Sequence, residues 1–165
     1  MFYKCCNLTE LELSHFNTKN SCSFVSMFEG CSKLEYIDIS NFDSSSCENL
    51  TGMFCDCENI TEVNMLKWDM SKIKRFHESY NGLDRLFQGC KKLGYIKMNC
   101  NFNNINYILK NNIKNEYKNG KNIKTYHSVT LFFGLPEYGT FIYPKKNKCD
   151  ILINKLPKSW NIIEE

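Results

Sequence analysis

Aliphatic residues recur along residues 1–102 with a spacing that repeats. The pattern L-x-x-L-x-L occurs four times in this part of the chain. Its members are Leu8, Leu11 and Leu13; Leu34, Ile37 and Ile39; Ile60, Val63 and Met65; and Leu93, Ile96 and Met98. The last two residues of each trio alternate with other positions, which is typical of a short strand with one buried face. We therefore predict one strand in each copy, with the aliphatic residues facing the core.

The same short motif precedes every copy of this pattern. Its first two residues are Met1-Phe2, Met27-Phe28, Met53-Phe54 and Leu86-Phe87, and a cysteine stands four positions after the first of them, at Cys5, Cys31, Cys57 and Cys90. An aromatic residue closes the copies at Phe16, Phe42, Trp68 and, displaced by one position, Phe102. We define copies 1 to 4 as residues 1–26, 27–52, 53–85 and 86–102. Copy 3 is longer because seven residues are inserted before Leu86.

The segment between two strands predicts a helical turn. Leu50, Met53, Phe54 and Cys57 fall at i, i+3, i+4 and i+7, which is one face of a short helix, although Gly52 leaves a 3₁₀ or irregular segment open. A single strand cannot bury itself, but copies stacked in parallel build a continuous core. The predicted fold class is an α/β repeat solenoid of leucine-rich-repeat type, with short parallel strands on one face and turns and short helices on the other.

The motif M-F-x-x-C-x-x-L-x-x-L-x-L-S-x-F resembles the BspA-type leucine-rich repeats, which include mollicute surface lipoproteins, and Met27 to Phe42 is the closest copy. The C-terminal part is similar to the usual ending of that family, since Gly139-Thr140 precedes Pro144, and Leu156-Pro157 precedes Trp160, Ile162 and Ile163. The resemblance implies a leucine-rich solenoid that is adhesive and located at the cell surface, without catalysis. The chain departs from this family in two ways, because its first residues show no signal peptide or lipobox and because copy 3 carries the insertion.

Two segments follow the repeats. Residues 103–125 are rich in asparagine and lysine and are expected to be an insertion or a degenerate coil, with an apolar stripe formed by Ile105, Ile108, Leu109 and Ile113. Lys110, Lys114, Lys118, Lys121 and Lys124 recur there at near-helical spacing, which would suit a phosphate-tracking patch. We favour the insertion and expect no nucleic-acid partner. Residues 126–165 are predicted to form a C-terminal capping segment.

Composition narrows the function classes. The chain has 165 residues and a formal charge of only +3, so its overall charge indicates neither nucleic acid nor an anionic membrane, and no apolar run is long enough to span a bilayer. Motifs of nucleotide-binding and hydrolytic enzymes are missing from the sequence, and no C-x-x-C pair suggests zinc. We therefore predict no enzyme activity, no cofactor and no metal. The ten cysteines leave disulfides open, but we favour reduced, buried thiols in the repeats.

The residues that alternate with the aliphatic trios are expected to face outward in columns. One column contains Glu10, Tyr36, Glu62 and Tyr95, the next contains Glu12, Asp38, Asn64 and Lys97, and a third contains Ser14, Ser40, Leu66 and Asn99. The first two columns are the predicted binding residues for a protein partner, which includes a host or cell-surface protein. The location follows as cell surface or secreted if the chain is a fragment of an exported protein, and as cytoplasmic if it is complete; an intracellular scaffold is the alternative function.

Overall fold

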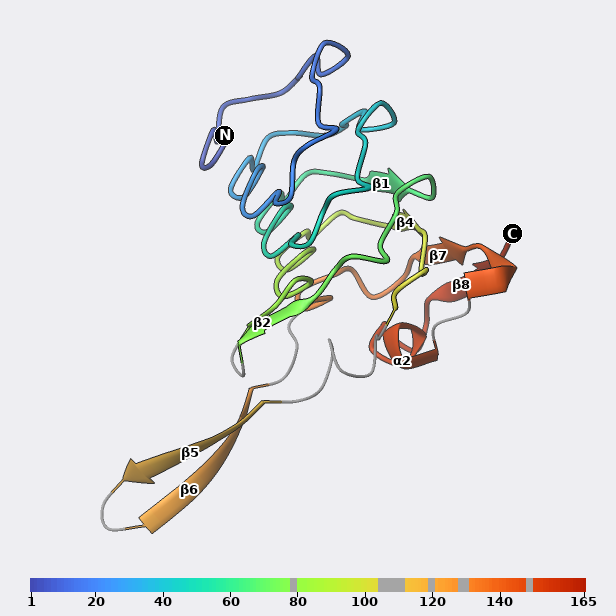
Figure 1. Cartoon of the computed structure of the whole chain (residues 1–165). Helices are drawn as coiled ribbons and strands as arrows, with labels where there is room; N and C mark the ends of the chain where they lie inside the picture. Colours follow the sequence, from blue (N-terminus) through green and yellow to red (C-terminus); the bar gives the residue numbers. More distant parts are fainter. Residues whose placement is uncertain (78–79, 104–111, 119–120, 128–130, 148–149) are drawn as a thin grey trace.

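The computed structural model describes residues 1–77, 80–103, 112–118, 121–127, 131–147 and 150–165. Its strands are β1 (Glu62–Met65), β2 (Arg75–His77), β3 (Tyr80–Asn81), β4 (Tyr95–Met98), β5 (Asn112–Lys118), β6 (Lys121–His127), β7 (Thr140–Tyr143) and β8 (Asn161–Glu164). Helix within the described ranges is limited to the 3₁₀ turn η1 (Lys145–Asn147) and the short helix α2 (Asp150–Ile153). Strands β1, β4, β7 and β8 form a parallel sheet in that order, whereas β2 pairs with β3 and β5 with β6 in two antiparallel hairpins (Figure 1).

The register of the sheet matches the alignment of the repeats. In β1 and β4, Val63 lies opposite Ile96 and Met65 opposite Met98, so equivalent positions of copies 3 and 4 are neighbours. All four of these side chains are fully buried, and the residues between them are partly or fully exposed. The predicted inward and outward assignment is therefore confirmed for both strands.

The helical turn predicted for residues 48–57 is wrong, because this segment is a series of overlapping β-turns. Amides alternate in their partners: Gly52 and Phe54 donate to carbonyls of the next copy at 2.8 and 3.0 Å, whereas Met53 and Cys55 each donate three residues back at 3.0 Å. A helix would direct every amide four residues back along its own chain. It would also exclude the left-handed conformation that Gly52 adopts at φ 62°. The backbone here therefore joins one copy to the next.

The same alternating hydrogen bonds join all consecutive copies on the turn side. Phe2, Phe28, Phe54 and Phe87 donate their amides to the carbonyls of Met27, Met53, Leu86 and Leu131, respectively, at 2.9 to 3.1 Å. The last of these bonds reaches beyond copy 4. Phe141 follows Phe132 by the same nine positions that separate Ile96 from Phe87, and Ile96 pairs with Phe141 in the sheet. Residues 131–143 therefore continue the repeat, and we call them copy 5; the predicted domain boundaries themselves stay predictions.

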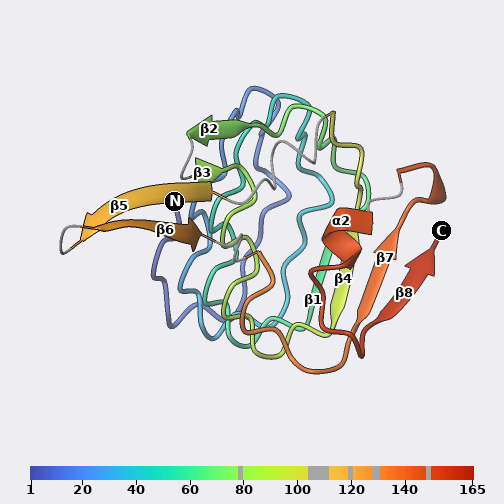
Figure 2. The same cartoon turned by 90° about the horizontal axis from the view of Figure 1, so that it is seen from below.

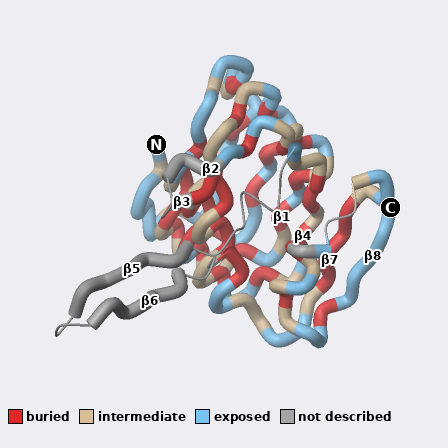
Figure 3. Tube along the Cα trace, turned by 60° about the horizontal axis from the view of Figure 1, so that its bottom comes forward, coloured by how far each residue is buried: buried red, intermediate tan, exposed pale blue. Residues whose placement is uncertain are grey.

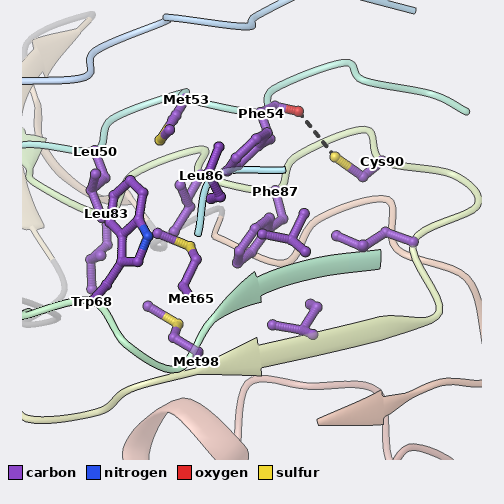
Figure 4. Close-up of a cluster of buried hydrophobic side chains, with 14 of the residues drawn as sticks. Leu50, Met53, Phe54, Met65, Trp68, Leu83, Leu86, Phe87, Cys90 and Met98 are labelled. Carbon is purple, nitrogen blue, oxygen red and sulfur yellow. Dashed lines mark hydrogen bonds between the residues drawn. The ribbon is translucent and has the colours of Figure 1, made fainter. Parts of the chain in front are cut away.

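Equivalent side chains stack in columns through the core. The rings of Phe2, Phe28, Phe54, Phe87 and Phe132 lie on one another with centroid separations of 5.6 to 6.1 Å. Beside them, the thiols of Cys31, Cys57 and Cys90 each donate to the carbonyl of the phenylalanine one copy earlier, at 3.0 to 3.1 Å. Figure 4 shows the bond from Cys90 to Phe54, within a cluster of side chains from the turns and strands. These three cysteines are buried, as predicted, and burial raises their pKa, which keeps the thiols protonated.

Strands are absent where two of them were expected. Residues 8–14 and 34–40 carry the predicted pattern but form no strand, and the only backbone bond between the trios of copies 2 and 3 is from the amide of Thr61 to the carbonyl of Glu35 at 3.3 Å, within the described ranges. The strands do not form because successive copies separate on the side of the aliphatic trios, whereas hydrogen bonds join them closely on the turn side (Figure 1). The prediction of one strand per copy therefore holds for copies 3 and 4 only.

Both insertions leave the repeat at the same point, between the closing aromatic residue and the next turn segment. The seven extra residues of copy 3 contain the β2–β3 hairpin, and the segment before copy 5 contains the β5–β6 hairpin. Figure 2 shows the two hairpins on one side of the molecule and the four-stranded sheet on the other. Four of the lysines expected at helical spacing, Lys114, Lys118, Lys121 and Lys124, therefore belong to strands, and Lys118 lies opposite Lys121 in the register. Ile105, Ile108, Leu109 and Lys110 lie outside the described residues.

Candidate binding face

The structure places the predicted binding residues on one outward-facing surface. In the sheet, Glu62 lies opposite Tyr95 and Asn64 opposite Lys97, so both predicted columns are confirmed between copies 3 and 4. Their counterparts in copies 1 and 2 are Glu10, Tyr36, Glu12 and Asp38, which are all exposed. Figure 3 shows the exposed and buried positions alternating along these segments. We call this surface, formed by all eight residues, the hollow face; its role in binding stays a prediction.

Two hollows lie where the copies separate. The larger, about 600 Å³, is lined by Thr9, Glu10, Leu11, Glu12, Glu35 and Tyr36, and therefore lies between copies 1 and 2. The smaller, about 350 Å³, is lined by Tyr36, Ile37, Asp38, Ile39, Ser40, Glu62 and Asn64, between copies 2 and 3. Tyr36 belongs to both linings, and its side chain is 66% exposed. The two hollows are therefore neighbours that share one aromatic ring.

Carboxylates on this face are held in fixed positions. Glu12 accepts a hydrogen bond from the Ser14 amide at 2.7 Å, and Asp38 accepts one from the Ser40 amide at 2.9 Å. These backbone hydrogen bonds lower the pKa of both carboxyl groups, because they stabilise the ionised form. Asn64 repeats the arrangement in copy 3 by accepting from the Leu66 amide at 3.2 Å.

Charge is distributed unevenly along the hollow face. In the sheet, Lys97 forms an ion pair with Glu62 at 2.8 Å, and the hydrogen bond from Lys97 to Glu62 raises the pKa of the lysine. Glu10, Glu12, Glu35 and Asp38 form no ion pair with any residue that the structure describes. The face is therefore neutralised internally at copies 3 and 4 and remains acidic at copies 1 and 2.

Sequence reasoning did not identify two residues of this site. Thr9 and Glu35 each occupy the position before the first predicted column, and both line the larger hollow. A regular ladder of strands would have left no space beside these positions, so their accessibility depends on the separation of the copies. The third column was expected to continue the face, but of its residues only Ser40 lines either hollow.

A second polar cluster, on the turn side, has a structural role. Arg85 donates to Glu29 and to the sulfur of Cys55, both at 3.0 Å, and Ser26 donates to the other oxygen of Glu29 at 2.5 Å. Glu29 and Cys55 are buried. Burial raises the pKa of Cys55 to about 11 in spite of the neighbouring guanidinium, so the thiol is protonated at neutral pH and is a poor nucleophile. The cluster thus links copies 1, 2 and 3.

The described ranges contain no metal-binding cluster and no membrane-spanning helix. No group of three His, Cys, Asp or Glu side chains there is arranged to hold a metal ion, and no described helix is long and apolar enough to cross a bilayer. The cysteines that the structure describes are free thiols, with Cys5, Cys6 and Cys22 exposed, whereas Cys149 lies outside the described residues. The predictions of no metal, no cofactor and no catalysis stay predictions.

The fold and its repeats define a repeat protein with a parallel sheet on one side of the chain. The chain belongs to the family described as "Mycoplasma protein of unknown function, DUF285", which matches residues 1–126. No curated protein and no solved structure matches it. The match covers copies 1 to 4, the β2–β3 hairpin and the β5–β6 hairpin except its last residue, His127, and the resemblance to BspA-type repeats is compatible with it.

Proposed function

We propose that the chain is a non-catalytic protein-interaction or adhesion module that binds a protein partner through its hollow face. The observation that carries this proposal is the combination, on one surface, of exposed tyrosines, two hollows and carboxylates that form no ion pair with a described residue. Tyr36 and Tyr95 are 66% and 51% exposed, so both are accessible to a partner. Tyrosine is enriched among the residues that contribute most to protein–protein binding.

The architecture behind this proposal is a leucine-rich-repeat solenoid of BspA type. Its support is the regular hydrogen bonding between consecutive copies and the five stacked phenylalanines, which extend in one direction through copies 1 to 5. Stacked repeats present extended surfaces, and proteins of this kind commonly bind through them. A location at the cell surface, as part of an exported protein, accompanies the proposal. The alternative is an intracellular scaffold.

Photo-crosslinking tests the proposed function. A benzoylphenylalanine is placed at Tyr36 on the hollow face and, in a matched control, at Tyr138, which is equally exposed at 68% but lines neither hollow. We expect the Tyr36 position to capture a discrete protein from intact cells or their surface fraction. Excess unlabelled wild-type chain should prevent the capture, and excess chain carrying Tyr36→Ala and Tyr95→Ala should not. Equal capture at the two positions would contradict the proposal.

The compartment is tested separately by the state of the thiols. Mass spectrometry of the native chain under non-reducing conditions should show disulfides if the chain is exported, since these persist in oxidising compartments. Ten free thiols would favour the intracellular scaffold. The exposed Cys5, Cys6 and Cys22 are the residues to follow, because oxidants reach them without unfolding.

A further inference from the structure

We infer that the larger hollow holds an extended, basic polypeptide segment of the partner protein. This inference rests on the proposed function and specifies the chemistry of the partner at copies 1 and 2. Among the described residues, main-chain groups without a hydrogen bond, carboxylates without an ion pair and an exposed aromatic ring lie at or beside this hollow, and each favours a different feature of such a segment.

Two segments beside the hollow have main-chain groups without a partner among the described residues, whereas the carbonyl of Glu35 accepts from the Thr61 amide. The N–H and C=O groups of residues 10–12 and 36–38 form no hydrogen bond within the described parts of the chain. The equivalent residues of copies 3 and 4 pair with each other as β1 and β4. A segment in extended conformation satisfies such groups with its own backbone, which is how many peptides bind beside an existing strand. The unpaired backbone therefore favours a partner that is an extended polypeptide.

The carboxylates that line the hollow indicate the charge of the bound segment. Glu10, Glu12 and Glu35 line the hollow, and none of them forms an ion pair with a residue that the structure describes. Glu12 is already oriented by its bond to the Ser14 amide, so binding need not restrict it further. Because three like charges line one hollow and form no ion pair with a described residue, a cationic side chain is the complementary ligand.

Tyr36 also favours a cationic side chain in the bound segment. Its ring borders the hollow and is two-thirds exposed, and an arginine or lysine placed over an aromatic face is attracted by the ring electrons. The hollow of about 600 Å³ lies within the range of about 300–1,000 Å³ that is common for ligand sites. The face at copies 3 and 4 lacks this combination, because Lys97 neutralises Glu62 there.

A titration of the full chain with defined peptides tests the inference. The probe is an acetylated and amidated pentapeptide with the sequence arginine–threonine–arginine–threonine–arginine, whose arginines share one side of an extended strand. One control replaces each arginine by citrulline, which keeps the shape and removes the charge, and a second carries N-methyl groups on the threonine amides. Affinity is measured by NMR titration, and amide hydrogen exchange is followed at residues 10–12 and 36–38.

We expect the arginine peptide to bind at least tenfold more tightly than both controls and to slow exchange at these two segments. Combining Glu10→Gln with Glu35→Gln should weaken binding at least tenfold. The matched variant Asp56→Asn with Glu137→Gln removes the same charge from exposed residues outside the hollows and should leave the affinity unchanged. Equal binding of the citrulline peptide, or an equal loss in both double variants, would overturn the inference.

The inference and the proposed function fail in different ways. If the protein captured at Tyr36 binds the Glu10→Gln, Glu35→Gln variant as tightly as the wild type, the basic segment is wrong and the hollow face still binds a protein. If crosslinking at Tyr36 and Tyr138 gives the same products, the proposed function is wrong. The peptide titration is independent of that result, because its probe is defined.

Discussion

Replacing Gly89 by alanine perturbs the turn column at a position where the backbone is left-handed. Gly89 has a φ of 75°, and its equivalents in the other copies are Lys4, Gly30, Asp56 and Gly134, all with a positive φ between 57° and 80°. A residue with a side chain costs about 1–2 kcal/mol in this region. An added Cβ would also lie 2.2 Å from the Asp56 carboxylate, which must then rotate away.

The cost of the left-handed backbone can be separated from the cost of moving the Asp56 carboxylate. Asp56 is exposed, so rotation of its side chain is cheap and the conformational cost should dominate. We expect Gly89→Ala to lower the free energy of unfolding by about 1–2 kcal/mol, which corresponds to about 2–4 °C in Tm per kcal/mol for a chain of this size. In a chain that already carries Asp56→Gly, the same substitution should cost up to about 1 kcal/mol less, because no carboxylate needs to move.

Urea denaturation followed by circular dichroism measures these differences, with an unchanged slope m as the condition for comparing midpoints. Gly94→Ala is the control, because Gly94 is not left-handed and its added Cβ would meet nothing closer than 3.9 Å. That substitution should be neutral or stabilising by up to about 1 kcal/mol. If Gly89→Ala and Gly94→Ala have equal effects, the left-handed turn column is refuted.

Three further predictions concern the core, the hollow face and one tyrosine. Trp68→Phe should cost less than about 1 kcal/mol, because it removes a buried indole N–H that has no partner among the described residues, whereas Trp68→Ala should cost about 3–5 kcal/mol in urea melts. Ile37→Asp should cost several kcal/mol and Tyr36→Ala almost nothing, since only Ile37 is buried; equal thermal melts would contradict this. The hydrogen bond from the Tyr143 hydroxyl to Glu164 raises the pKa of the tyrosine to about 12. The stabilisation from this bond should therefore be complete below pH 10 and be lost between pH 10 and 12. In Tyr143→Phe, the free energy of unfolding should lack this loss over the same pH range.

The sequence predicted most accurately those features that follow from the period itself. Val63 and Ile96 are neighbours in the sheet because every copy places an aliphatic residue at the same offset, and a slip by one position would expose them. The buried thiols of Cys31, Cys57 and Cys90 were predictable for the same reason, whereas the prediction was wrong for Cys5, which is exposed in copy 1. Copy 5 was missed because Leu135 replaces the motif cysteine and because Tyr138, Phe141 and Tyr143 stand at the three aliphatic positions.

Features that depend on competition between neighbours were not predictable from one copy alone. The apolar spacing of Leu50, Met53 and Phe54 suits a helix, but alternate amides are used by the next copy, and this outcome requires the neighbour to be present. The β5–β6 hairpin had a local signal, since Asn119-Gly120 separates its strands and this dipeptide is typical of two-residue hairpin loops. The hollows had no local sequence signal, because they depend on the distance between successive copies.

The common point at which both hairpins leave the repeat has a practical consequence. Segments of very different length enter there, yet the hydrogen bonds that join Leu50 to Gly82 and Phe87 to Leu131 on either side are retained. This position in the repeat is therefore an attachment point, where a tag or a whole foreign domain can be grafted into copies 1 or 2 while the stacked phenylalanines stay in place.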